Sequence, residues 1–156
     1  MNDEAEDIIS ALEATHRWLG DALTVAGKGL VEAPRGGGEW GLADSIGHLR
    51  ASDAILAPRV LHVLIRPGAP LAAFDERAWA GLAAAAGVSI AEQLTEFALR
   101  RRELVGVLRS LNQEQWTLAG EHELRGTMTV AQIAASIVEH EAEHRVQIGS
   151  LLAASS

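Results

Sequence analysis

Residues 129–153, TVAQIAASIVEHEAEHRVQIGSLLA, contain the pattern that decides the fold. Thr129 followed by Gln132 forms a capping box, a typical start of a helix. Apolar residues then recur at intervals of three and four, as they do on one face of an α-helix. The segment therefore predicts one long amphipathic helix, from Val130 to about Ala153.

Two histidines interrupt the apolar stripe of this helix. The stripe consists of Val130, Ile133, Ile137, Ile148 and Leu151. His140 and His144 stand where hydrophobic residues are due, so we expect both imidazoles to face the interior. Because they are one turn apart, both can close on a single ion, which would keep them neutral and compensate for their burial. The alternative is a pair of core histidines that neighbouring hydrogen bonds satisfy.

His140, Glu141 and His144 also spell H-E-x-x-H, the motif of many zinc proteases. Those proteases take a third ligand downstream, whereas no His, Asp or Glu follows His144 in this chain. A third ligand must come from upstream, and peptidase activity is disfavoured. Glu141 lies about 100° around the helix from its histidine neighbour, so it can act as a catalytic base only if the site opens on that side. Otherwise it is an exposed carboxylate or one that supports the ligands.

Three further helical patterns precede this segment. The first follows an acidic N-terminal turn and ends near Gly27, and the second begins around Leu42 and stops before RPGAP at 66–70. The third opens at Ser89, which forms a capping box with Glu92. We find no convincing strand pattern. The sequence therefore predicts an all-α, four-helix bundle, a fold that builds its sites from side chains facing the interior.

The segments between these helices are less regular. Three consecutive glycines at 36–38 exclude a regular element there, and residues 75–85 favour a short helix. Arginines 100–102 fit a solvated face of the third helix. His122 fits a loop position.

Composition limits the classes of function. The 156 residues fit one domain, 1–156, and 48% hydrophobic with 22% charged residues is ordinary for a globular protein. The net charge of −8 disfavours nucleic acid and anionic membranes as partners. Cysteine is absent, so a metal would need His, Asp, Glu or water as ligands. We expect no signal peptide and no membrane span, and hence a cytoplasmic protein.

Upstream, the best third ligand is His48, which borders the apolar stripe of the second helix. The three stretches around the candidate ligands are EWGLADSIGHLRASDAI at 39–55, FDERAWA at 74–80 and GTMTVAQIAASIVEHEAEHRVQIGSLLA at 126–153. Their order and spacing resemble the DinB and YfiT-like metal-binding four-helix family. The resemblance spans about Trp40 to Leu152, which is most of the chain.

This resemblance implies a three-histidine site, His48, His140 and His144, for a divalent ion with open positions for water or substrate. Zinc is the first expectation and nickel the next, since imidazole suits both. The chain differs from the family in Gly41, where a polar helix cap commonly follows the Trp, and in Glu141, where the family frequently has other residues. The first difference affects a helix boundary, and the second leaves the role of the glutamate open.

The resemblance further implies a metal-dependent transferase that uses a low-molecular-weight thiol and an electrophilic substrate. A thiol would have to be a cosubstrate, because the protein has no cysteine. Two alternatives stay open, a non-enzymatic metal-binding stress-response protein and a metal-dependent hydrolase. A homodimer is also expected.

Four further residues are candidates for supporting roles. His16 falls on the inward stripe of the first helix and lines the pocket or makes a local hydrogen bond. Gln147, one turn after His144, can orient an imidazole or a bound water. Asp44 and Asp53 flank the upstream histidine by about one turn, and one of them can accept its second ring N–H.

Overall fold

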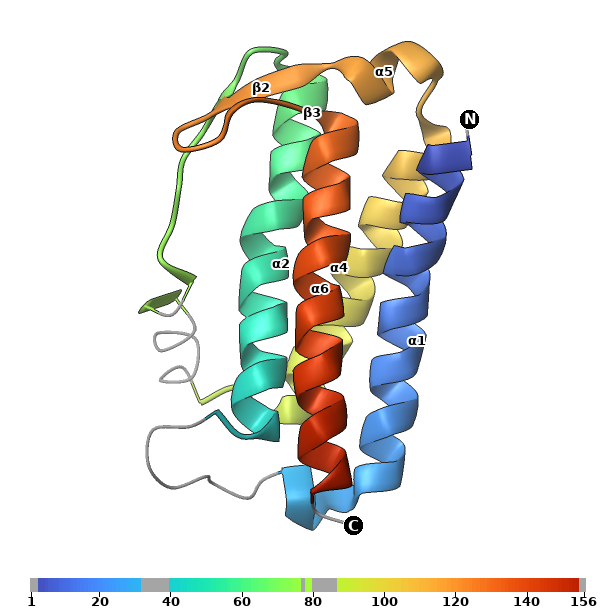
Figure 1. Ribbon diagram of the computed structural model, residues 1–156, viewed down its shortest axis with the longest axis vertical. Helices are drawn as coiled ribbons and strands as arrows, with labels where there is room; N and C mark the ends of the chain where they lie inside the picture. Colours follow the sequence, from blue (N-terminus) through green and yellow to red (C-terminus); the bar gives the residue numbers. More distant parts are fainter. Residues whose placement is uncertain (1–2, 32–39, 77, 80–86, 155–156) are drawn as a thin grey trace.

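The computed structural model describes residues 3–31, 40–76, 78–79 and 87–154 (Figure 1). Its long helices are α1 (Asp3–Val31), α2 (Leu42–Ile65), α4 (Ile90–Ser110) and α6 (Val130–Ala153). They lie side by side along the long axis, with α1 and α2 each packed against both α4 and α6. The four-helix bundle expected from the sequence is confirmed.

The helix starts follow the predicted caps. Ser89 Oγ accepts the backbone N–H of Glu92 at 3.3 Å, and Thr129 Oγ1 accepts that of Gln132 at 3.1 Å. The prediction that the first helix ends near Gly27 is wrong, since α1 continues to Val31. A glycine costs a helix about 1 kcal/mol relative to alanine, which weakens the helix without ending it.

A small sheet covers one end of the bundle, and the expectation of no strands is wrong. Parallel pairing joins β1 (Pro70–Leu71) to β2 (Ala119–His122), and antiparallel pairing joins β2 to β3 (Gly126–Thr129). A short helix, α5 (Gln113–Thr117), precedes β2 (Figure 1). Strands of two to four residues are too short to show an alternating pattern in the sequence.

Two predictions concern segments only partly described. The glycine run at 36–38 and, within the predicted short helix, residue 77 and residues 80–85 lie outside the described residues. At the start of that helix, the Asp75 carboxylate accepts the N–H of Ala78 at 2.9 Å, and its carbonyl accepts the N–H of Trp79 at 3.0 Å. This single turn carries Glu76.

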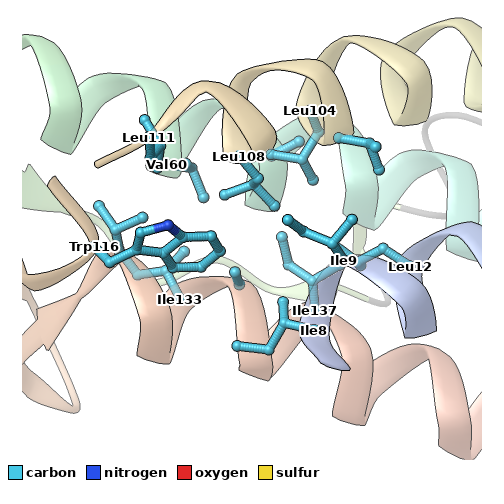
Figure 2. Packing of buried hydrophobic residues seen from close by; sticks show 14 of the residues in the cluster. Ile8, Ile9, Leu12, Val60, Leu104, Leu108, Leu111, Trp116, Ile133 and Ile137 are labelled. Atoms are coloured by element: carbon cyan, nitrogen blue, oxygen red, sulfur yellow. The ribbon is translucent and has the colours of Figure 1, made fainter. Parts of the chain in front are cut away.

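The hydrophobic core has two parts. The larger, at the end that bears the sheet, joins all four long helices and includes Trp116 of α5 (Figure 2). Its labelled members are Ile8, Ile9, Leu12, Val60, Leu104, Leu108, Leu111, Trp116, Ile133 and Ile137. The smaller part contains Leu19, Leu42, Ile46, Leu49, Phe97 and Ile148. On every long helix, the residues between these two sets include polar ones.

Arg101 is the largest fully buried side chain of the described residues, contrary to the prediction for its segment. The arginine run at 100–102 was expected to face solvent, yet Arg101 is 2% exposed. Its guanidinium forms ion pairs with Asp53 of α2, at 2.9 Å, and with Glu141 of α6. We call these three residues the ion-pair cluster. It joins α2, α4 and α6 at the level between the two parts of the core.

Among the described residues, no helix combines the length and the apolarity that crossing a bilayer requires.

Candidate metal centre

Three histidines converge between α2 and α6, level with the polar layer. His48 comes from α2, and His140 and His144 come from successive turns of α6. One ring nitrogen from each can be chosen so that all three lie within 4.8 Å of one another. The ring centroids are 4.6 Å apart for His48 and His144, 4.6 Å for His140 and His144, and 5.1 Å for His48 and His140. The residues expected to form one site are therefore adjacent.

The imidazoles of His48 and His140 are held in the neutral state. Burial, with a smaller effect from the neighbouring rings of His144 and His140, lowers the pKa of His48 to about 4. Burial and His144 likewise lower the pKa of His140 to about 4. Both rings therefore keep a lone pair at neutral pH, which is the form that binds metal ions.

The spacing of the donor nitrogens suits one ion. His48 Nε2 and His140 Nε2 are 3.0 Å apart. Two imidazole nitrogens on a tetrahedral zinc ion, each about 2.0–2.1 Å from it, are about 3.4 Å apart, so a small movement of the rings admits the ion. The residues present therefore fit a divalent metal with imidazole ligands.

Gln147 orients one of the rings, as the sequence suggested. Its Oε1 lies 2.9 Å from His144 Nδ1 and accepts a hydrogen bond from it, which leaves Nε2 of His144 as the lone-pair nitrogen. Trp40 packs against the same group, with its ring centroid 4.7 Å from that of His48 and 6.3 Å from that of His144. These contacts restrict the rotamers of the candidate ligands.

Neither aspartate next to His48 orients its ring, contrary to expectation. Asp44 accepts the backbone N–H of Gly41 at 2.8 Å and caps α2, and Asp53 belongs to the ion-pair cluster. Within the described residues, His48 Nδ1 is buried without a hydrogen-bond partner. The carboxylate of Asp44, three residues downstream, thus caps the helix at Gly41, which has no polar side chain of its own.

Glu76 is a site residue that the sequence analysis missed. Its Oε2 lies 3.5 Å from His48 Nε2 and 3.4 Å from His140 Nε2, and its side chain is 42% exposed. The carboxylate therefore stands at the solvent side of the histidines, where it can accept a proton. It belongs to the quoted stretch FDERAWA, but periodicity does not show which way a residue in a connecting segment points.

Glu141 is buried rather than exposed. It is 2% exposed, and burial raises the pKa of its carboxyl to about 7 although Arg101 lowers it. Its ion pair with Arg101 turns it toward α4, away from the cavity that His140 lines. This placement favours the supporting role over that of a base.

Two other histidines lie apart from the group. His16 lines a separate cavity between α1 and α4, with its ring centroid 6.3 Å from that of Phe97. His122 was expected in a loop but lies on β2, where its side chain is buried.

Comparison with known proteins places the chain in a family. Residues 11–148 match the DinB superfamily. The chain belongs to the DinB superfamily. A solved structure with the same fold is YfiT from Bacillus subtilis, described as a probable metal-dependent hydrolase with an unusual four-helix bundle topology. The match has a TM-score of 0.83 at 21% sequence identity and covers 97% of this chain and 87% of YfiT. No curated protein sequence matches the chain at a significant level.

Proposed function

We propose that this DinB-superfamily protein is a metal-dependent transferase, in which His48, His140 and His144 bind one divalent ion and a low-molecular-weight thiol is the nucleophile. The observation that carries the proposal is the convergence of three imidazoles, with one ring nitrogen of each within 4.8 Å of the others and two of the rings with a pKa of about 4. Zinc is the expected ion and nickel the next, since affinity for imidazole does not separate them in a cell.

The protein's own side chains have distinct tasks in this proposal. A bound divalent ion would lower the pKa of a thiol or water and polarise an electrophile. Glu76 accepts the proton that the nucleophile loses, because its carboxylate lies within 3.5 Å of both His48 Nε2 and His140 Nε2. Gln147 holds the ring of His144 in position. The thiol comes from a cosubstrate, because the chain contains no cysteine.

Hydrolysis is the second candidate. The description of YfiT as a probable metal-dependent hydrolase favours it, and Glu76 could take a proton from water as readily as from a thiol. A non-enzymatic metal-binding protein remains the third. A homodimer and a cytoplasmic location stay predictions.

A turnover assay separates these functions. The fully metallated protein is incubated with an aromatic halide or an epoxide, with and without each of a panel of physiological thiols, and separately with a p-nitrophenyl ester. The proposal predicts thiol-dependent conjugation that His140→Ala abolishes and His62→Ala, at an exposed position of α2, retains. Ester hydrolysis without thiol, lost in His140→Ala, would favour the hydrolase. One bound ion without either reaction would favour the non-enzymatic protein.

A further inference from the structure

A cavity of about 340 Å³ lies along the seam between α2 and α6 and reaches the sheet; we call it the seam cavity. His140 and Glu76 line it at the histidine site, and Arg59, His122 and Arg125 line it as well. Arg59 follows His48 by eleven residues, about 16 Å or three turns along α2. The volume is within the range of small-molecule sites.

Neither arginine of the seam cavity forms an ion pair in the part of the chain that the structure describes. Four other arginines of the described chain form ion pairs with carboxylates: Arg50, Arg100, Arg101 and Arg109. Within the described residues, no such pair includes Arg59 or Arg125. Arg59 instead donates to the carbonyl of Ala72 and lies 5.2 Å from the ring centre of Phe74. Its position is therefore fixed, while no carboxylate of the described residues forms an ion pair with it.

The charges around Arg59 are reflected in its pKa. Burial and the charge of Arg125 lower the pKa of Arg59, and the carboxylate of Glu76 raises it by less than the two together lower it. Arg59 is half-buried and Arg125 is exposed, so an anion in the cavity could reach both guanidinium groups and offset their mutual repulsion. Arginine pairs with carboxylates through two parallel hydrogen bonds, so the pair suits a carboxylate.

His122 adds a neutral donor to this end of the cavity. Its Nδ1 accepts the backbone N–H of Leu124 at 3.1 Å and that of Arg125 at 3.3 Å, which places its proton on Nε2. These bonds shape the turn between β2 and β3, which closes at Gly126 with a φ of 71°. The hydrogen bond to His122 thereby holds the backbone of Arg125 in place.

The opposite end of the seam cavity is acidic. Glu76, Glu139 and Glu143 line it near His140. A divalent ion on the three histidines would offset these carboxylates, whereas among the described residues the two arginines form no ion pair and only the more distant charge of Glu76 partly offsets that of Arg59. The cavity therefore has a polarity that would orient an elongated substrate, with its anionic end toward the sheet.

We propose that the seam cavity binds a substrate with a carboxylate group, which Arg59 and Arg125 hold while the reactive atom of the substrate lies at the three-histidine site. The proposal rests on the metal function proposed above. The two arginines are then determinants of specificity that lie at a distance from the ion. The substrates are small carboxylates.

Matched hydroxamates provide the test. A hydroxamate binds a metal ion directly, so monohydroxamates of the dicarboxylic acids from succinic to suberic acid can span the cavity, and alkyl hydroxamates of equal length serve as controls. Binding to the cobalt-loaded protein is followed by the visible absorption of cobalt. We expect one chain length to bind about tenfold more tightly with the carboxylate than without it. The advantage should disappear in Arg59→Gln and in Arg125→Gln and remain in Arg102→Gln, a surface control on α4.

The outcomes separate this proposal from the metal function. Equal binding of both hydroxamate types at every length, or an advantage that survives both substitutions, would overturn the carboxylate site while leaving the metal site intact. If cobalt does not bind, the metal function fails and the cavity is tested alone with adipate and the metal-free protein. Adipate should then shift the Nε–Hε NMR resonance of Arg59, with a weaker response in Arg125→Gln. No shift at saturating adipate would refute the inference.

Discussion

Replacing Arg101 by methionine tests how the polar layer of the bundle is held together. The substitution removes the only cation of the ion-pair cluster and leaves the carboxylates of Asp53 and Glu141 buried. Both acidic residues are 2% exposed, so water cannot replace the guanidinium. Methionine has a similar length and can keep the contact with Phe97, whose ring centre lies 5.0 Å from the guanidinium carbon. The change in stability therefore reports mainly on charge.

The magnitude follows from the burial of the cluster. Removing one partner of a buried ion pair costs about 3–5 kcal/mol, because it leaves a charge without compensation. Burial raises the pKa of Glu141 to about 7 even beside Arg101, so this carboxyl can take up a proton in the variant and limit the loss. We expect the free energy of unfolding to fall by about 3 kcal/mol at pH 7.5.

The sign of the pH dependence gives a second check. In the variant, the pKa of Glu141 in the folded protein exceeds its value in the unfolded chain. The folded state then binds more protons, and its stability rises as the pH falls from 8 toward 5. The difference between the parent and Arg101→Met should therefore shrink in that range.

Guanidinium chloride unfolding of the metal-free proteins, followed by circular dichroism, measures both effects. Arg102→Met on the exposed face of α4 is the matched control and should change stability by less than about 0.5 kcal/mol. Adding Glu141→Gln to Arg101→Met should restore part of the loss, since it removes one uncompensated carboxylate. A loss below about 1 kcal/mol at pH 7.5, independent of pH, would refute the assignment of Arg101 to a buried cluster.

Three further predictions follow from the geometry. Gly120→Ala should destabilise the protein by about 1–3 kcal/mol in urea unfolding, since the new Cβ would lie 2.9 Å from the backbone oxygen of Ala69; unchanged stability would contradict this packing. Stability of the metal-free parent should fall more steeply than that of His48→Gln between pH 6.5 and 4, because the pKa of His48 is about 4 in the fold and the unfolded chain binds the extra proton; parallel pH profiles would refute the neutral ring. Glu76→Gln should lower kcat by about 10²–10⁴-fold with one ion still bound, whereas Glu139→Gln should have little effect; equal rates in parent and Glu76→Gln would exclude it as the proton acceptor.

Helical periodicity alone accounts for much of the fold and part of the site. The capping boxes gave the starts of α4 and α6, and the stripe of α6 identified His140 and His144 as inward residues. His48 depended on the resemblance to a family as well as on its place beside an apolar stripe. The strands could not be predicted, because two to four residues carry no readable alternation and their pairing depends on contacts between distant segments.

The position of Arg101 in the sequence indicates that it is buried, although the prediction placed it on a solvated face. It stands four residues after Phe97 and three before Leu104, on the buried stripe of α4, but the neighbouring arginines suggested a solvated face. Glu141 likewise follows Ile137 by one turn. A charged residue on an apolar stripe indicates a buried ion pair when opposite charges fall on the stripes of neighbouring helices. Glu76 had no such signal, since its position depends on the path of a connecting segment.

The stoichiometry of bound cobalt shows whether the three histidines bind a metal ion. The tag-free protein is stripped of metal, reconstituted with cobalt and desalted, and its metal content is measured by elemental mass spectrometry. We expect about one ion per chain in the parent and in His62→Ala, and none in His48→Ala or His140→Ala. An ion that persists in both of these variants, or a parent that retains none, would contradict this expectation.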